Sequence, residues 1–393
     1  MSSHMREPIA EASAADIGAA ATGTDSSPSA EERQAAGAPT ELQSESAPDT
    51  APGRMESWLR SDFRQLGRAY VSVTLVAGAA VSWAALIAVT WAAGWHQVWG
   101  GLLDANWIWL VVAPIGVLIS HLGYALTYQQ VARVGEGPDL AGEEAVAMVT
   151  TGFGPFSPRG GFALDVGGFR TLGLPKREAT LRVRTLGMLE YCVLAPATFG
   201  CALYLFLAGR PSQAGLLPSW IIGVPVGTVI TLALLLLYRR KGRPDTWWAP
   251  AGHALDAVEG TFRVLRSRSD GPLSLFGMTA YWAADIAVLA ACMAVFTHRH
   301  SVGPAIVVGY ATGYALTRRS LPLAGAGAVE ALLPFALTWV GYPLATSILA
   351  VISYRLFNLW FAVIPAIAGL RQLRRHRRRE PRTEPGGLQG VEV

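Results

Sequence analysis

The chain has 393 residues, of which 51% are hydrophobic and only 15% charged, which is too apolar for an average soluble enzyme. The net charge of +4 does not indicate a nucleic-acid partner, because the basic residues gather at the ends of apolar runs. The three cysteines lie inside those runs without CxxC spacing, so neither a disulfide framework nor a zinc site is supported. We therefore expect a membrane protein that uses no cofactor and binds no nucleic acid.

The N-terminal segment, residues 1–55, is rich in Ala, Ser, Glu, Pro and Thr and nearly lacks aromatic side chains. Such a segment buries too little apolar surface to offset its ordering entropy, which predicts a disordered cytoplasmic tail. It also lacks the charged and apolar regions of a secretory signal, so the first apolar run is expected to be a retained span. A second tail, basic and then polar, is expected at residues 376–393.

Long apolar runs follow, each able to cross about 30 Å of hydrocarbon at about 1.5 Å per residue. They occupy residues 70–93, 106–128, 191–208, 216–238, 273–297 and 344–370. Apolar residues also recur every three or four positions over 246–268, which predicts an amphipathic cytoplasmic helix. The pattern predicts an all-α, polytopic helix bundle of about 6–8 spans over residues 56–375.

Basic residues set the expected orientation of these spans. Arg60, Arg64 and Arg68 precede the first run, and six arginines between Arg371 and Arg379 follow the last. By the positive-inside rule both termini lie in the cytoplasm, as in a multi-pass protein of the bacterial plasma membrane. The segment 94–105 has no Lys or Arg and is edged by tryptophans, which indicates an external loop with an aromatic belt.

Two Gly- and Pro-rich stretches, 152–161 and 317–330, interrupt the apolar runs. Backbone freed from a helix within a membrane must face protein or a watery cavity. Paired breaks in two halves of a chain point to a transport site near the bilayer midplane. The turns 173–175 and 341–343, both Gly-x-Pro, precede apolar segments expected to run in opposite directions, as inverted repeats do. Whether the broken segments are re-entrant hairpins or short crossings stays open here.

Charges inside a membrane are costly, and they mark substrate pathways or buried pairs. A broken helix offers N–H groups to a phosphate or carboxylate, and arginine adds bidentate contacts. The candidate substrate-binding residues are Arg159, Gly160, Gly161, Asp165, Arg170, Glu190, Asp285, Arg318, Arg319, Pro322, Gly325, Gly327, Glu330, Tyr354 and Arg355. Structural alternatives remain, because Glu330 and Arg355 can form a buried pair, Arg318 and Arg319 can reach an interface, and Glu190 can be interfacial.

Motifs in both halves resemble those of one family. Leu321-Pro322 with Gly325, Gly327 and Glu330, then Tyr354-Arg355 before a basic tail, is similar to the membrane domain of lysylphosphatidylglycerol synthase/flippases. The stretch 158–161, with Arg170 and Glu190, resembles the family's first-half motif, although Phe153, Phe156 and Ser157 stand where members often carry Asn and more Gly. The resemblance implies lipid movement between leaflets. It does not imply aminoacyl-lipid synthesis, because the soluble transfer domain does not follow Arg379.

Three functions remain open at this point. The first is a flippase or translocase for an anionic or aminoacylated phospholipid or a polyprenyl-linked lipid. The second is a membrane enzyme of lipid-linked glycan assembly, and the third is an accessory subunit of such assembly. The absence of HExxH, GxSxG, Walker and strand-linked GxGxxG motifs leaves no catalytic residue and no metal ligand to name. The expected partners are membrane lipids, together with a lipid-modifying enzyme or a glycosyltransferase.

Overall fold

A computed structural model describes residues 68–103, 105–134, 137–156, 160–210, 212, 215–241, 249–297, 303–314 and 321–379. For 68–69, 241, 249–251 and 373–379 only the backbone is described. These residues belong to one compact unit, Met55–Val393. The two predicted tails lie outside the described residues, apart from the start of the second.

Every regular element of the described ranges is helical, which confirms the predicted all-α class. The first half contains α2 (Arg68–Ala93), α3 (Trp95–Leu103), a 3-10 turn (Trp107–Val111), α4 (Val112–Arg133), α5 (Gly142–Phe153), α6 (Gly161–Thr171) and α7 (Lys176–Leu207). The second contains α8 (Leu216–Lys241), α9 (Ala249–Arg266), α10 (Asp270–Phe296), α11 (Pro304–Gly313), a 3-10 turn (Pro322–Gly325), α12 (Ala328–Trp339), α13 (Leu344–Arg355), a π-helical segment (Leu356–Phe361) and α14 (Val363–Arg379).

Seven helical stretches of the described chain are long and apolar enough to cross a membrane, so the protein is a multi-pass membrane protein, as predicted. One of the seven, Pro322–Trp339, joins the 3-10 turn to α12, and the regular helix within it has only 12 residues. At about 1.5 Å per residue, α12 is roughly 18 Å long, too short to span the hydrocarbon alone. The helices α5, α6 and α11, with 12, 11 and 10 residues, are equally short.

Two sequence expectations need correction. The segment 94–105, predicted to be a loop, contains α3, because Val98 is buried while the tryptophans of that segment stay exposed, as in an amphipathic helix. The run predicted at 191–208 is only the second part of α7, which already begins at Lys176. Its first turns carry charged residues that a hydropathy pattern excludes, yet good helix formers such as Arg and Glu continue the helix there.

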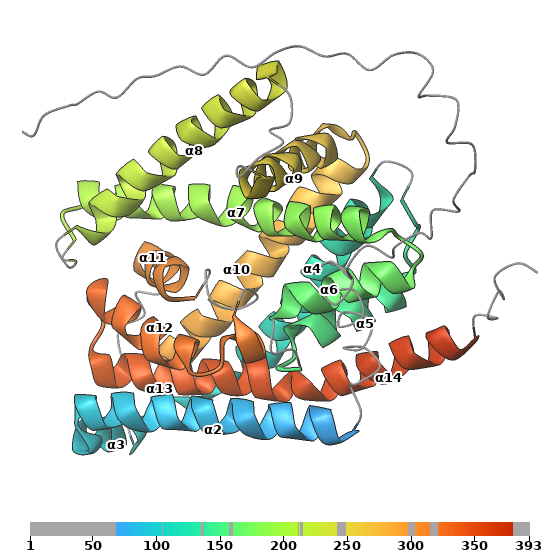
Figure 1. Cartoon of the computed structure of the whole chain (residues 1–393). Helices are drawn as coiled ribbons and strands as arrows, with labels where there is room; N and C mark the ends of the chain where they lie inside the picture. The colour runs from blue at the N-terminus through green and yellow to red at the C-terminus, as the bar shows by residue number, and fades with distance from the viewer. Residues whose placement is uncertain are drawn as a thin grey trace, which may run out of the picture. The chain divides into compact units, whose positions relative to one another are not determined.

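The two pairs of short helices lie at opposite ends of the bundle. In Figure 1, α5 and α6 lie toward the right and α11 and α12 toward the left, with α7 on one side and α13 and α14 on the other. Contacts agree with this view, since α5 packs on α14, α6 and α11 on α7, and α12 on α13. The start of α2 and the end of α14 lie at the same end of the bundle, as two termini on one side of a membrane require.

The long helices α4 and α10 pack closely at the centre of the molecule. Glycines permit this approach, because a Cβ at Gly123 would lie 2.6 Å from the carbonyl of Gly277, and one at Gly277 would lie 2.5 Å from that of Gly123. Thr127 spans the same contact by donating its hydroxyl to the Ser274 carbonyl at 3.1 Å. Small residues at a helix crossing are typical of membrane bundles, where close backbone packing replaces the hydrophobic effect.

The same order of elements occurs twice, as α2 to α7 and as α8 to α13. The turns 173–175 and 341–343 have matching geometry, with a glycine at φ of 85° or 101°. In both, the next residue donates its N–H to the carbonyl five positions back, at 3.3 and 3.2 Å, and the proline that follows is an N-cap, of α7 in the first half and of α13, which begins the stretch Leu344–Gln372, in the second. Together with the opposite directions of α7 and α13 in Figure 1, this geometry supports the predicted inverted repeat.

Candidate functional site

The first break separates α5 from α6. Gly160, the N-cap of α6, has φ 84° and ψ 169°, a conformation essentially restricted to glycine. Before it, Gly154 packs so tightly that a Cβ there would lie 2.4 Å from the Phe156 ring. Phe153 and Phe156 are both buried, so the aromatic residues in this motif fill space behind the break. Arg159 lies outside the described residues.

The second break is a left-handed turn in front of α12. Leu323, Ala324 and Gly325 have φ of 54°, 55° and 70°, and Gly327 follows at 83°. A left-handed conformation costs an ordinary L-residue about 1–2 kcal/mol, so Leu323 and Ala324 must be held by their surroundings. Pro322 begins this turn, whereas Arg318 and Arg319 fall outside the described residues.

Glu330 and Arg355 hold the second break together. Arg355 donates from Nε to Glu330 Oε1 at 2.8 Å and from Nη2 to the Ala324 carbonyl at 3.3 Å. Ser82 of α2 donates to the same Oε1 at 2.8 Å, and the Gly327 N–H donates to Oε2 at 2.8 Å. Both charged side chains are at most 2% exposed.

This geometry indicates that Glu330 and Arg355 hold the second break in position. Both oxygens of the Glu330 carboxylate are used by protein donors, and one of them occupies the anion position at the start of α12. The pair was predicted as a structural alternative to substrate binding, and its contacts favour that alternative.

The two breaks meet on α2. A Cβ built at Gly78 would lie 3.7 Å from Pro155 Cβ in the first break, and 4.0 Å from the Cβ atoms of both Leu323 and Ala326 in the second. Helix α6 also contacts the turn Pro322–Gly325. Segments more than 150 residues apart in sequence therefore lie side by side between the ends of the bundle. This is the juxtaposition that the paired breaks predict for a midplane site.

A second buried polar cluster surrounds Asp285 of α10. Its carboxylate accepts hydrogen bonds from the hydroxyls of Tyr310 and Tyr354, the latter at 2.8 Å, and from the Asn358 amide. Tyr314 donates to the amide oxygen of Asn358 at 2.9 Å. The cluster joins α10, α11, α13 and the π-helical segment, and π-helical turns frequently mark functional sites.

Glu190 lies in the corresponding place of the first half. It is fifteen residues after the proline of the turn 173–175, as Asn358 is after that of the turn 341–343. Its Oε1 accepts from the Tyr124 hydroxyl at 2.7 Å, and its backbone carbonyl accepts from the Trp282 indole at 3.1 Å. At 6% exposure it is buried within α7. The interfacial alternative for Glu190 does not fit this environment.

The other predicted residues of the first half lie on α6. Gly161 begins the helix and is buried, Asp165 is buried one turn later, and Arg170 is half-buried in the last turn. The Tyr128 hydroxyl reaches the backbone carbonyl of Asp165 at 3.4 Å. The structure therefore places these residues on the short helix that contacts the second break.

Sequence reasoning missed the neutral members of both clusters. Ser82, Tyr124, Tyr310, Tyr314 and Asn358 were not singled out, because the search followed charges. A usable signal was present: Tyr310 and Tyr314, at the end of α11, and Tyr354 and Asn358, across the end of α13 and the π-helical segment, are each spaced i and i+4, a spacing that favours one helix face. No group of three His, Cys, Asp or Glu side chains within the described ranges is arranged to hold a metal ion.

Comparison with known families agrees with this architecture. Residues 75–366 match the family model described as the lysylphosphatidylglycerol synthase TM region. The match includes both breaks, both Gly-x-Pro turns and the Glu330–Arg355 pair. No match was found among curated proteins.

Proposed function

Because the chain belongs to the lysylphosphatidylglycerol synthase transmembrane-region family, which indicates a function connected with membrane lipids, we propose that it moves a lipid between the leaflets of a bacterial plasma membrane. The observation that carries this proposal is the meeting of two broken-helix pairs, from opposite ends of the bundle, on α2. Non-helical backbone at membrane depth is tolerated only where it is enclosed by protein or lines a polar path.

The two breaks differ in a way that supports one of them as the headgroup contact. At α12 the Glu330 carboxylate already binds the N–H of the N-cap residue. At α6 the N-cap is Gly160, which has no side chain that could accept from the first turn. The N–H groups of a helix start that lacks such a side-chain acceptor favour binding of a phosphate or carboxylate. We assign the headgroup to the start of α6, near Gly160 and Gly161.

The substrate class in this proposal is an anionic or aminoacylated phospholipid or a polyprenyl-linked lipid. Arg159, Arg170, Arg318 and Arg319 would supply charge near the two breaks, since arginine binds phosphate oxygens bidentately. Asp165 would face the ammonium group of an aminoacylated headgroup. The protein would perform no covalent chemistry itself, and its partner would be a lipid-modifying enzyme or a glycosyltransferase that supplies or consumes the lipid.

Reconstitution into phosphatidylglycerol-containing vesicles tests the proposal. A fluorescent phosphatidylglycerol in the inner leaflet should become accessible to a membrane-impermeant quencher only when the protein is present. A flat trace at high protein density would refute lipid movement. It would favour the accessory-subunit or glycan-assembly alternatives.

One substitution tests the assigned end of α6. Ala163 is the third residue of α6, as Glu330 is of α12. Ala163→Glu should place a carboxylate over the helix start and slow phosphatidylglycerol movement about tenfold or more, because one unpaired like charge costs a kcal/mol or more at low dielectric. Ala163→Gln is the matched neutral control and should keep most of the activity. Equal rates for the two variants would remove the start of α6 from the site.

A further inference from the structure

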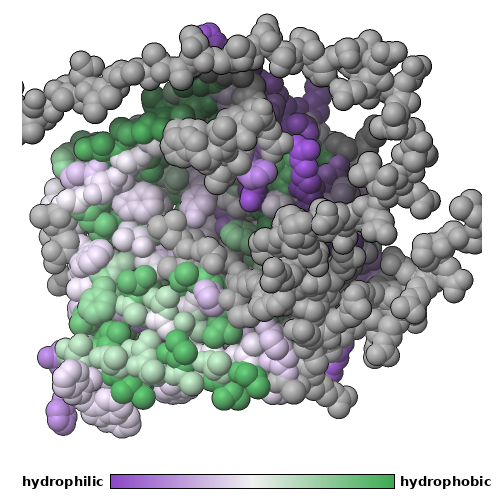
Figure 2. All heavy atoms as spheres, viewed as in Figure 1, coloured by the Kyte–Doolittle hydropathy of each residue, from purple (hydrophilic) through white to green (hydrophobic). Residues whose placement is uncertain are grey.

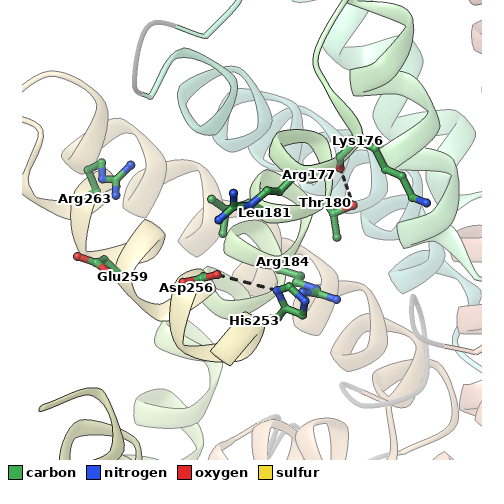
Figure 3. Close-up of a pocket in the computed structure, with 9 residues that line it drawn as sticks. All are labelled: Lys176, Arg177, Thr180, Leu181, Arg184, His253, Asp256, Glu259 and Arg263. Carbon is green, nitrogen blue, oxygen red and sulfur yellow. Dashed lines mark hydrogen bonds and ion pairs between the residues drawn. The ribbon is translucent and has the colours of Figure 1, made fainter. Parts of the chain in front are cut away.

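A basic pocket lies where α7 begins, opposite α9. It has a volume of about 570 Å³ and is lined by residues of these two helices, among them Lys176, Arg177, Arg184 and Arg263. Figure 3 shows the residues that line the pocket, with Lys176, Arg177 and Arg184 on α7 and Arg263 on α9. The start of α7, which lines this pocket, is at the end of the bundle that also holds the start of α2 and the end of α14 (Figure 1).

The two carboxylates of this pocket contact residues other than its four cations. Asp256 accepts from the Tyr238 hydroxyl at 2.7 Å and lies 4.0 Å from His253, and Glu259 contacts Arg239 at 3.5 Å. Lys176, Arg177, Arg184 and Arg263 form no ion pair within the described part of the chain. Four cations against two carboxylates leave the lining of this pocket with a net positive charge, which attracts an anion.

A separate apolar groove lies farther along α7. It has a volume of about 410 Å³ and lies between α7, α8 and α9, with Met188 and Cys192 on α7 and Phe262 and Leu265 on α9. On α8 it is lined by Gly223 and Gly227, and a Cβ at either would meet no atom within 4 Å. Met188 is one helical turn beyond Arg184, and Phe262 is adjacent to Arg263, so pocket and groove share two helices.

Comparison of α8 with its counterpart in the first half shows that α8 is less closely packed. The equivalent of α8 in the first half is α2, which packs on α12 and α13, while Val89 and Val98 are buried against Ile348 and Leu349. In the most apolar window of α8 only 6% of residues are buried, against 33% in α2. Figure 2 shows the exposed apolar surface of α8 and hydrophilic side chains where α9 lies. The second half therefore keeps open a space that the first half fills.

We propose that the pocket and groove together form a second lipid site, which holds an anionic phospholipid with its phosphate among the four cations and an acyl chain between α7, α8 and α9. A phospholipid with a charged headgroup and an apolar tail matches both parts of this surface. Exposed apolar grooves rimmed by charge mark such binding sites. The site does not depend on the proposed movement of lipid through the breaks.

Native mass spectrometry of the purified full chain, equilibrated in detergent with equal amounts of phosphatidylglycerol and phosphatidylcholine, tests the proposal. The wild type should retain phosphatidylglycerol preferentially. Arg177→Gln with Arg184→Gln should reduce that preference about tenfold, since each lost charge contact is worth roughly a kcal/mol or less at an exposed site. Arg210→Gln with Arg371→Gln, which removes the same charge from exposed positions outside the pocket, should leave it unchanged.

A groove variant tests the second half of the claim. Gly227→Phe should fold, because the position is open, and it should lower retention of both lipids by filling the space for the acyl chain. Gly200→Phe, at an equally open position of α7 outside the groove, is its control. The proposal is refuted if the control pair lowers the preference as much as the pocket pair, or if Gly227→Phe retains lipid normally. Displacement of the lipid by millimolar glycerol phosphate would equally refute it, since the groove would then contribute nothing.

Discussion

The Glu330–Arg355 pair supports a prediction whose size follows from its contacts. Glu330→Gln keeps one acceptor oxygen but replaces the other with an NH₂ group. Three donors converge on this carboxylate at 2.8 Å each, from Arg355, Ser82 and Gly327, so at least one of them loses its acceptor. The Arg355 guanidinium stays charged at 2% exposure. Removing one partner of a buried pair costs about 3–5 kcal/mol.

The assay is thermal unfolding in detergent, followed by the fraction that remains monodisperse. For a helical body of this size, each kcal/mol corresponds to about 2–4 °C, so Glu330→Gln should lower the melting temperature by at least about 6 °C. Adding Arg355→Gln should recover about 1–3 kcal/mol of that loss, because the double variant buries no unpaired charge. Glu178→Gln, whose exposed carboxylate is 3.9 Å from Arg182, is the control and should shift stability by less than about 0.5 kcal/mol.

The result that would refute this reasoning is a Glu330→Gln protein that melts with the wild type. If both single variants and the double variant fold normally but fail to move lipid, the pair instead contacts the headgroup. Normal melting and normal lipid movement in all three would remove the pair from the site and leave Gly160, Asp165 and Arg170 as its centre.

Three further predictions concern other parts of the molecule. Ala324→Gly should raise the unfolding free energy by about 1 kcal/mol, measured by the same melting assay, because glycine tolerates φ 55° without the cost to an L-residue; an unchanged or lower value would show that no strain is stored there. Asp285→Asn should lower the unfolding free energy by about 1–3 kcal/mol, because an NH₂ group would replace one of the two oxygens that now accept from three donors. An unchanged unfolding free energy would mean that the cluster rearranges. Reporter enzymes active only outside the cell should give no signal when fused to either terminus, and an active C-terminal fusion would contradict the predicted cytoplasmic location.

Hydropathy and charge predicted most of the helices, because a helix that crosses the hydrocarbon must be apolar along its length. The spans that became α2, α8 and α10 contain long uninterrupted apolar runs, and their positions agree closely with the helices. The amphipathic helix predicted at 246–268 is α9, although its buried face includes Ala257, Thr261 and Val264 rather than Phe262. The first half of α7 was missed since its charged turns lie beyond the apolar run.

The site was harder to predict, because no local sequence pattern shows which distant segments come together in the fold. Glycine and proline showed where Gly160 and Pro322 interrupt the helices, but not that both breaks would meet beside Gly78. The pairing of Glu330 with Arg355 was among the sequence alternatives, and charge alone made it reasonable. The Asp285 cluster depends on hydroxyl and amide groups such as Asn358, whose hydrogen bonds decide their role only after folding.

The unequal packing of α2 and α8 has a consequence for the states of this protein. Since α2 packs on α12 and α13 of the second half, we expect an exchange of conformations between the two inverted copies, in which α8 would close in the same way on the first half while α2 moves outward. Such an exchange is a rotation about the axis that relates the copies, with α4 and α10 as the pivot between them. In the described arrangement the open groove lies beside α8. In the exchanged arrangement that we expect, an equivalent groove would lie beside α2 and face the opposite leaflet.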